Sequence, residues 1–114
     1  MSTGKLRVLV ADDEHHILDL VDAVLSESDY AVECVPTGEA AMEKLQDRDY
    51  DLLISDLRMP GIGGRELVEW VRSEGKSSKI LLLTGDVASR EMKDFIASSG
   101  SQYLSKPFRN RRAD

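Results

Sequence analysis

The sequence is poor in cysteine and has no long apolar run. Its 114 residues include one cysteine, Cys34, which excludes an internal disulfide and fits a reducing compartment such as the cytoplasm. Because Cys34 lies in the apolar-rich run AVECV, we expect it to be a small buried side chain. No stretch approaches the roughly 20 apolar residues of a membrane span, and MSTGKLRV lacks the apolar segment of a signal peptide. We therefore expect no membrane partner.

Basic residues are in the minority. Fifteen Lys and Arg stand against 21 Asp and Glu, which gives a net charge of −6. A surface that binds nucleic acid has the opposite balance, so we expect this domain to bind none. The basic run RNRR at 109–112 is interpreted as a solvated chain end.

Short apolar runs alternate with amphipathic stretches along the chain. The length is sufficient for one domain and too small for two. Apolar runs predict strands at 6–10, 31–35, 51–55, 79–84 and 102–105. Helical spacing of apolar residues predicts helices at 14–27, 37–47, 66–75 and 89–99.

The order of these elements predicts the fold class. Apolar strands without alternation, separated by helices, indicate a parallel sheet that is covered on both faces. Five such strands predict a doubly wound, flavodoxin-like α/β fold with the strand order 2-1-3-4-5. In that fold the functional residues lie at the carboxyl ends of the strands, near the point where the strand order reverses.

Charged and hydroxyl side chains stand at that edge. The first strand leads to Asp12 and Asp13, the third to Asp56, the fourth to Thr84 and the fifth to Lys106. Clustered carboxylates repel one another unless water or a cation lies among them. Oxygen ligands without His or Cys favour a hard ion, and few direct carboxylates with several waters fit Mg²⁺ better than Ca²⁺.

The same residues are suited to a phosphoryl group. A cation and Lys106 would neutralise the phosphoryl oxygens, and Thr84 would donate a hydrogen bond. No Ser, Cys or His nucleophile with a base is expected in this cleft, which leaves the carboxylate of Asp56 as the candidate nucleophile. A solvated helix start would explain the acid pair by itself, but it does not explain the pair together with Asp56 and Lys106.

Four motifs in this order make the sequence resemble a known family. They are ADDE (11–14), ISDLRMPG (54–61), LLLTGD (81–86) and YLSKPF (103–108). Together they resemble the CheY-like receiver domains of response regulators in bacterial two-component signalling. The resemblance covers residues 5–108 and implies one receiver domain over 1–114. Such a domain is a phosphoacceptor signalling domain that promotes its own phosphorylation and dephosphorylation, and it is not an enzyme with a separate substrate.

The resemblance implies a role for each residue of the chemical site. Asp56 is expected to be the phosphoacceptor and Lys106 to contact the phosphoryl group. Mg²⁺ is expected to bind Asp13, Asp56 and the backbone carbonyl of Arg58 directly, and Asp12 through a water molecule.

Further residues match the switch of the family. Thr84 and Tyr103 are expected to form a switch pair, in which the hydroxyl moves toward the phosphoryl oxygen and the ring turns inward. The Lys106–Pro107 peptide bond is expected to be cis. Gly63 stands where many relatives carry Asp, which is expected to loosen the start of the third helix because Asp is the better N-cap.

The resemblance also implies partners. The expected phosphoryl donor is a sensor histidine kinase or a histidine phosphotransfer domain, and the signal would pass to an output domain or a target protein. Relatives continue into a fifth helix, whereas 109–114 is short, so we expect that helix to be shortened or missing. The apolar area so uncovered is expected to be covered in a homodimer, or in a longer chain. The chain is thus expected to be a stand-alone regulator, or the receiver piece of a longer regulator or hybrid histidine kinase. The alternative is a receiver-like interaction module that works without phosphorylation.

Overall fold

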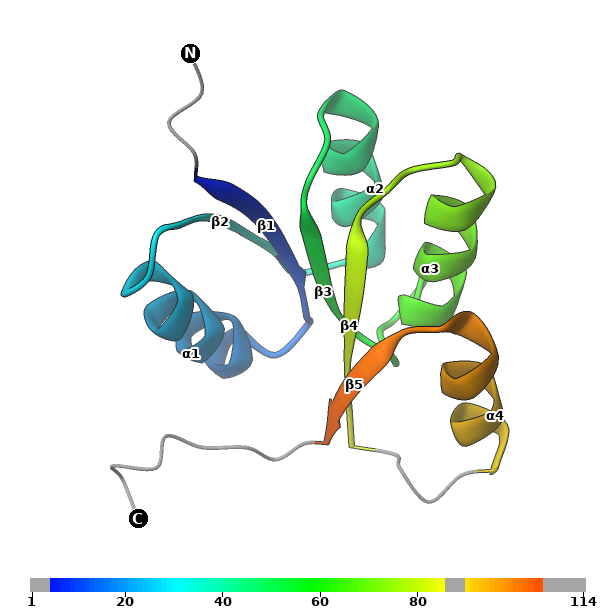
Figure 1. The fold of residues 1–114 in the computed structure, drawn as a ribbon. Coiled ribbons are helices and arrows are strands. Elements are labelled where there is room, and N and C mark those ends of the chain that lie inside the picture. The colour runs from blue at the N-terminus through cyan, green and yellow to red at the C-terminus, as the bar shows by residue number, and fades with distance from the viewer. Residues whose placement is uncertain (1–4, 86–89, 106–114) are drawn as a thin grey trace.

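A five-stranded parallel sheet organises the chain (Figure 1). The structure is a computed structural model that describes residues 5–85 and 90–105. The strands are β1 (Leu6–Ala11), β2 (Tyr30–Val35), β3 (Leu52–Asp56), β4 (Lys79–Thr84) and β5 (Gln102–Ser105). The helices in the described ranges are α1 (His15–Ser26), α2 (Gly38–Asp47), α3 (Gly64–Ser73) and α4 (Arg90–Ser99). The strand order β2-β1-β3-β4-β5 confirms the predicted doubly wound α/β fold.

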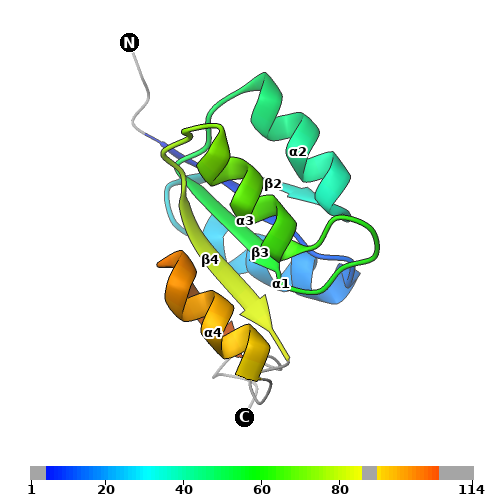
Figure 2. The same ribbon diagram turned by 90° about the vertical axis from the view of Figure 1, so that its right-hand side faces the viewer.

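The helices cover the two faces of the sheet unequally. Helix α1 packs on one face, and α2, α3 and α4 pack on the other (Figures 1 and 2). Alternate residues of each central strand enter opposite cores: Leu9 and Leu53 face the three-helix side, and Val10 and Ile54 face α1. All four are buried, which explains why these strands show no polar alternation in the sequence.

The α1 face is less completely covered toward β5. Leu104 pairs with Leu83 in the parallel register, so the two side chains lie on the same face of the sheet. Leu83 is 1% exposed, whereas Leu104 is 49% exposed. The expected shortened or missing fifth helix falls on residues 106–114, which lie outside the described residues.

Most local predictions are confirmed, with one clear error. Thr37 caps α2, because its Oγ1 accepts a hydrogen bond of 3.0 Å from the amide of Ala40, and this fits the helix predicted over 37–47. Cys34 was predicted to be buried, and that prediction was wrong: its side chain is exposed. The reason is that β2 is an edge strand of the sheet, so an apolar-rich run there is covered on fewer sides than in the centre. None of the four described helices combines the length and the apolar character that a membrane crossing requires.

A buried tyrosine ties β2 to the segment before β3. Tyr50 is 3% exposed, and its hydroxyl donates a hydrogen bond to Oε1 of Glu33. Nζ of Lys44 lies 3.7 Å from Oε2 of the same carboxylate. This hydrogen bond is the main cause that lowers the pKa of Glu33 below 4.5. Burial, and then the neighbouring carboxylate, raise the pKa of Tyr50 to about 12, so the phenol remains a donor.

This contact gives a pH-dependent contribution to stability. We expect Tyr50→Phe to lower the free energy of unfolding by about 1 kcal/mol at neutral pH, the usual net value of one hydrogen bond. Because the folded-state pKa of Glu33 is depressed, the charge-assisted part is present above pH 4.5 and is lost as the pH falls through the lower folded value. The measurement is urea unfolding of both proteins as a function of pH.

The difference in the free energy of unfolding between wild type and Tyr50→Phe should therefore become smaller in acid. Tyr30→Phe, on the same edge of the sheet, controls for the loss of a phenolic hydroxyl as such. A difference that stays constant from pH 7 to about pH 3 would contradict the assigned role of Glu33.

Candidate functional site

Three carboxylates meet at the carboxyl edge of the sheet. Asp12, Asp13 and Asp56 each offer an oxygen, and these oxygens all lie within 4.8 Å of one another. Asp12 is fully buried and Asp56 is 7% exposed, whereas Asp13 is exposed. The structure thus brings together the three acids that the sequence predicted as one site.

Two hydrogen bonds to neighbouring backbone groups, one from its amide and one to its carboxylate, hold Asp12 in this position. Its amide donates to the carbonyl of Val35 at 3.2 Å, which extends the pairing of β1 with β2 by one residue. Its Oδ1 accepts a hydrogen bond of 2.9 Å from the amide of Glu14, just before α1 begins. The side chain that approaches the other acids therefore also helps to turn the chain from strand to helix.

Asp56 reaches the same place from the neighbouring strand. It is the last residue of β3, one position later than the predicted strand end, and Ser55 before it pairs with Ala11 of β1. The residues that follow Ala11 and Ser55 are Asp12 and Asp56, so the parallel register sets the two acids side by side.

The predicted hydroxyl also lies at this edge, whereas the predicted lysine falls outside the described part. Thr84 is the last residue of β4 and is 1% exposed, and Leu83 before it pairs with Asp56. The fifth strand ends at Ser105, paired with Thr84. Lys106 and the expected cis bond to Pro107 lie beyond the described residues.

Tyr103 of β5 lies on the face of the sheet that α4 covers. It pairs with Leu82, whose side chain belongs to the three-helix side of the sheet, so the ring lies on the side of α4. The ring is 48% exposed and borders a hollow between α4 and β5 that is also lined by Ile96.

Glycine allows α3 to begin directly against the end of β3. The amide of Gly64 donates to the carbonyl of Leu57 at 3.0 Å, and the amide of Leu57 donates to the carbonyl of Leu83 at 2.8 Å. A Cβ on Gly64 would lie 2.6 Å from the carbonyl oxygen of Asp56, closer than such atoms approach. The loop 57–63, which contains Arg58, therefore begins and ends beside the backbone of Asp56.

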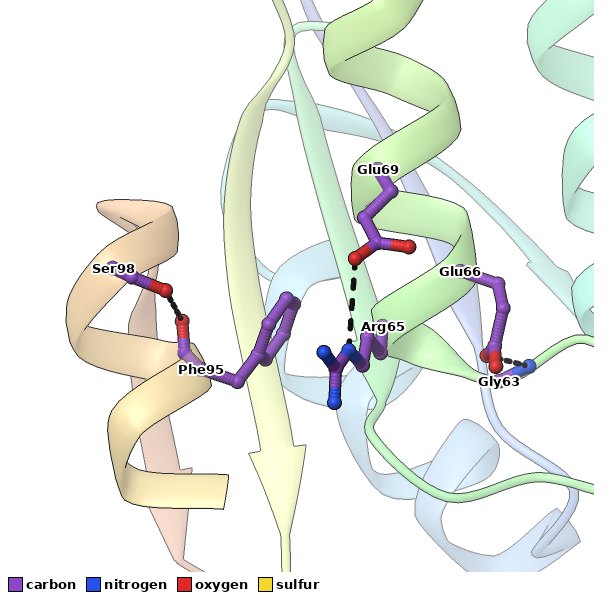
Figure 3. A network of polar contacts seen from close by, with 6 residues as sticks. All are labelled: Gly63, Arg65, Glu66, Glu69, Phe95 and Ser98. Atoms are coloured by element: carbon purple, nitrogen blue, oxygen red, sulfur yellow. Dashed lines mark hydrogen bonds and ion pairs between the residues drawn. The ribbon is translucent and has the colours of Figure 1, made fainter. Parts of the chain in front are cut away.

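The start of α3 is held by a residue that the sequence analysis did not single out (Figure 3). Gly63 is the N-cap and has no side chain to offer, as predicted, but Oε1 of Glu66 accepts a hydrogen bond of 3.0 Å from the amide of Gly63. This is one half of a capping box, and it opposes the expected loosening of the helix start. The signal for it was present in the sequence as a Glu three residues after the N-cap.

Arg65, in the first turn of α3, reaches across to α4. The guanidinium carbon of Arg65 lies 5.2 Å from the ring centroid of Phe95, and its Nε lies 3.6 Å from Oε2 of Glu69. Figure 3 shows the guanidinium of Arg65 beside the ring of Phe95, with a dashed line to the carboxylate of Glu69. Helix α3 therefore contacts both the loop that follows Asp56 and the helix on its other side.

The donor set fits a hard cation. The cluster consists of carboxylate oxygens, and no His or Cys belongs to it. Two of the three carboxylates are buried, where like charges interact more strongly than in water. Such a cluster is stabilised by a divalent ion, and oxygen donors are the ligands that Mg²⁺ and Ca²⁺ prefer.

Comparison with known proteins identifies relatives of this chain. The family model described as "Response regulator receiver domain" matches residues 8–113. The response regulator PhoP of Pseudomonas aeruginosa is 32% identical over 103 residues, which cover 90% of this chain. The chemotaxis protein CheY4 of Vibrio cholerae superposes with a TM-score of 0.83 at 34% identity, over 93% of this chain and 90% of that one.

A second similar structure is that of a metal complex. It is the response regulator TrrA of Thermotoga maritima in complex with Mg(2+)-BeF, with a TM-score of 0.80 at 35% identity, over 95% of this chain and 92% of that one. The curated relatives are longer than this chain. This chain spans 46% of the length of PhoP. It is also 32% identical over 117 residues to the sensor protein GacS of Pseudomonas syringae, and it spans 13% of that protein.

The close packing of α3 on the end of β3 can be tested by adding one carbon. We expect Gly64→Ala to lower the free energy of unfolding by about 1–3 kcal/mol, because the new Cβ would overlap backbone that cannot rotate away. Ser73→Ala, at the exposed end of the same helix, should change it by less than about 0.5 kcal/mol. Equal midpoints of urea unfolding for wild type and Gly64→Ala would refute this contact.

Proposed function

The chain belongs to the response-regulator receiver domain family, and from this we propose that Asp56 accepts a phosphoryl group from a phosphohistidine. Receiver domains are phosphoacceptor signalling domains that work with histidine kinases. The observation that carries the assignment is the meeting of Asp12, Asp13 and Asp56 within 4.8 Å at the carboxyl edge of the sheet. Asp56 lies at the end of a central strand, between Asp12, which follows β1, and Thr84 at the end of β4.

In the proposed reaction a carboxylate oxygen of Asp56 bonds to phosphorus. The bond from phosphorus to the imidazole nitrogen of the donor breaks, and the imidazole leaves with the electron pair. The hydroxyl of Thr84, buried at the end of the adjacent strand, would donate a hydrogen bond to a phosphoryl oxygen. Lys106 would contact another phosphoryl oxygen. Hydrolysis of the acyl phosphate would return the carboxylate.

The proposed cofactor is Mg²⁺. Asp13, Asp56 and the backbone carbonyl of Arg58 would hold it directly, and Asp12 through water. When bound, the ion would neutralise charge on the carboxylates and the phosphoryl oxygens. The support comes from the all-oxygen donor set and from the related TrrA structure with Mg(2+)-BeF.

We further propose that the signal leaves through α4 and β5. Phosphorylation adds about −1.5 to −2 charges, and the new bond from Thr84 would open space at the end of β4. The half-exposed ring of Tyr103 borders a hollow between α4 and β5, which gives it a place into which to turn. The recipient would be an output domain, a target protein or a second copy. We place the domain in the cytoplasm, where an exposed unpaired thiol such as Cys34 remains reduced.

Phosphorylation is tested by intact mass after incubation with acetyl phosphate and Mg²⁺. We expect a gain of one phosphoryl group in the wild type, and no gain with EDTA or in Asp56→Asn. Asp49→Asn is the matched control, because its side chain is 97% exposed, and it should be labelled like the wild type. An unlabelled wild type, with a histidine kinase as well as with acetyl phosphate, would favour the phosphorylation-independent module.

The metal is tested by its effect on stability. Mg²⁺ at one hundred times its dissociation constant should raise the free energy of unfolding by about 2.7 kcal/mol. We expect Asp13→Asn to abolish most of this gain, and to be at least as stable as wild type without metal, because it removes one of three mutually repelling charges at an exposed position. Urea unfolding with Mg²⁺ or EDTA measures both effects. An equal gain in wild type and Asp13→Asn would place the ion elsewhere.

A further inference from the structure

The first turn of α2 lies directly against the loop between β3 and α3. Gly38, the first residue of α2, is buried, and a Cβ there would overlap the carbonyl oxygen of Ile62 and lie 2.9 Å from its carbonyl carbon. Backbone therefore meets backbone at this point. The N-terminus of α2 is itself held in place by the cap from Thr37.

The next residue of α2 adds a polar contact to the same loop. Oε2 of Glu39 accepts a hydrogen bond of 3.4 Å from the amide of Ile62. The carboxylate also packs against Gly61, since a Cβ on Gly61 would lie 3.2 Å from Cδ of Glu39. Gly61 has a φ of +76°, a conformation that other residues rarely adopt, so this turn depends on glycine.

We propose that Glu39 is a positioning residue for the metal site, through its contact with this loop. The proposal rests on the proposed function, in which the backbone carbonyl of Arg58 binds Mg²⁺. The loop is closed at its two ends by the hydrogen bond from Gly64 to Leu57, and the side chain of Met59 is buried. The middle of the loop, the turn at 61–62, is not held by these contacts. It is held by α2, through Gly38 and Glu39.

The composition of the loop explains why such a contact matters. Three glycines at 61, 63 and 64 give the free loop many backbone conformations. A carbonyl ligand has no side chain to adjust, so its direction is set by the conformation of the loop. If the loop populates the binding conformation for only a fraction of the time, the apparent affinity for the ion falls by that fraction. Glu39 raises that fraction without touching the ion.

The test is isothermal titration of Mg²⁺ into the wild type and three variants. Glu39→Ala removes the acceptor, and we expect the dissociation constant to rise at least about twofold and at most about tenfold, the limit set by the loss of one hydrogen bond. Glu39→Gln keeps an acceptor oxygen and should stay within about twofold of the wild type. Glu43→Ala removes an equal charge from an exposed position one turn further along α2, and it should bind like the wild type.

A second readout does not depend on the ion. Hydrogen exchange of the Ile62 amide in metal-free protein should be faster in Glu39→Ala, and Glu39→Gln should restore the wild-type rate. A role in general stability alone would instead speed exchange across α2 and leave Mg²⁺ affinity unchanged once the protein is folded.

The outcomes separate this proposal from the proposed function. Equal affinity in wild type and Glu39→Ala overturns the positioning role and leaves the metal site intact. A Glu39→Gln variant as weak as Glu39→Ala also overturns it, because charge rather than the hydrogen bond would then be responsible. A wild type that does not bind Mg²⁺, or that binds it equally well as Asp13→Asn, overturns the metal site and the role of Glu39 together.

Discussion

The parallel register of β1 and β3 is the constraint on which the site depends. Because Ala11 pairs with Ser55, the residues that follow them, Asp12 and Asp56, leave the sheet side by side. Each strand is anchored by apolar residues on both faces, so neither can slip by one residue without turning its buried set outward. The core thereby forces like charges together, and that same proximity creates a place for a cation.

Backbone groups take part in the contacts that hold the elements around the acids. Asp12 is held by the amide of Glu14, and the loop after Asp56 is closed by the bond from Gly64 to Leu57. Glycine at 38 and 64 lets two helices begin within backbone distance of this loop. These contacts place α2 and α3 directly against the loop that follows Asp56.

Most of the fold could be predicted because its signals are local. Unbroken apolar runs separated by amphipathic stretches indicated the parallel sheet and the helices between its strands. The acids of the site could be predicted for a related reason: they follow strands, and parallel strands end at one edge. The exposure of Cys34 could not be predicted from its neighbours, since it depends on β2 being at the edge of the sheet.

The sequence by itself determined the order of the elements, the doubly wound topology and the acids, hydroxyl and glycines available to the site, because these follow from patterns within a few residues. Only the tertiary structure decided the 4.8 Å grouping of the acids, the contact of Arg65 with Phe95, and the meeting of Glu39 with the amide of Ile62. These pairs are separated by many residues along the chain. Their distances are set by how the helices pack on the two faces of the sheet, which no local pattern encodes.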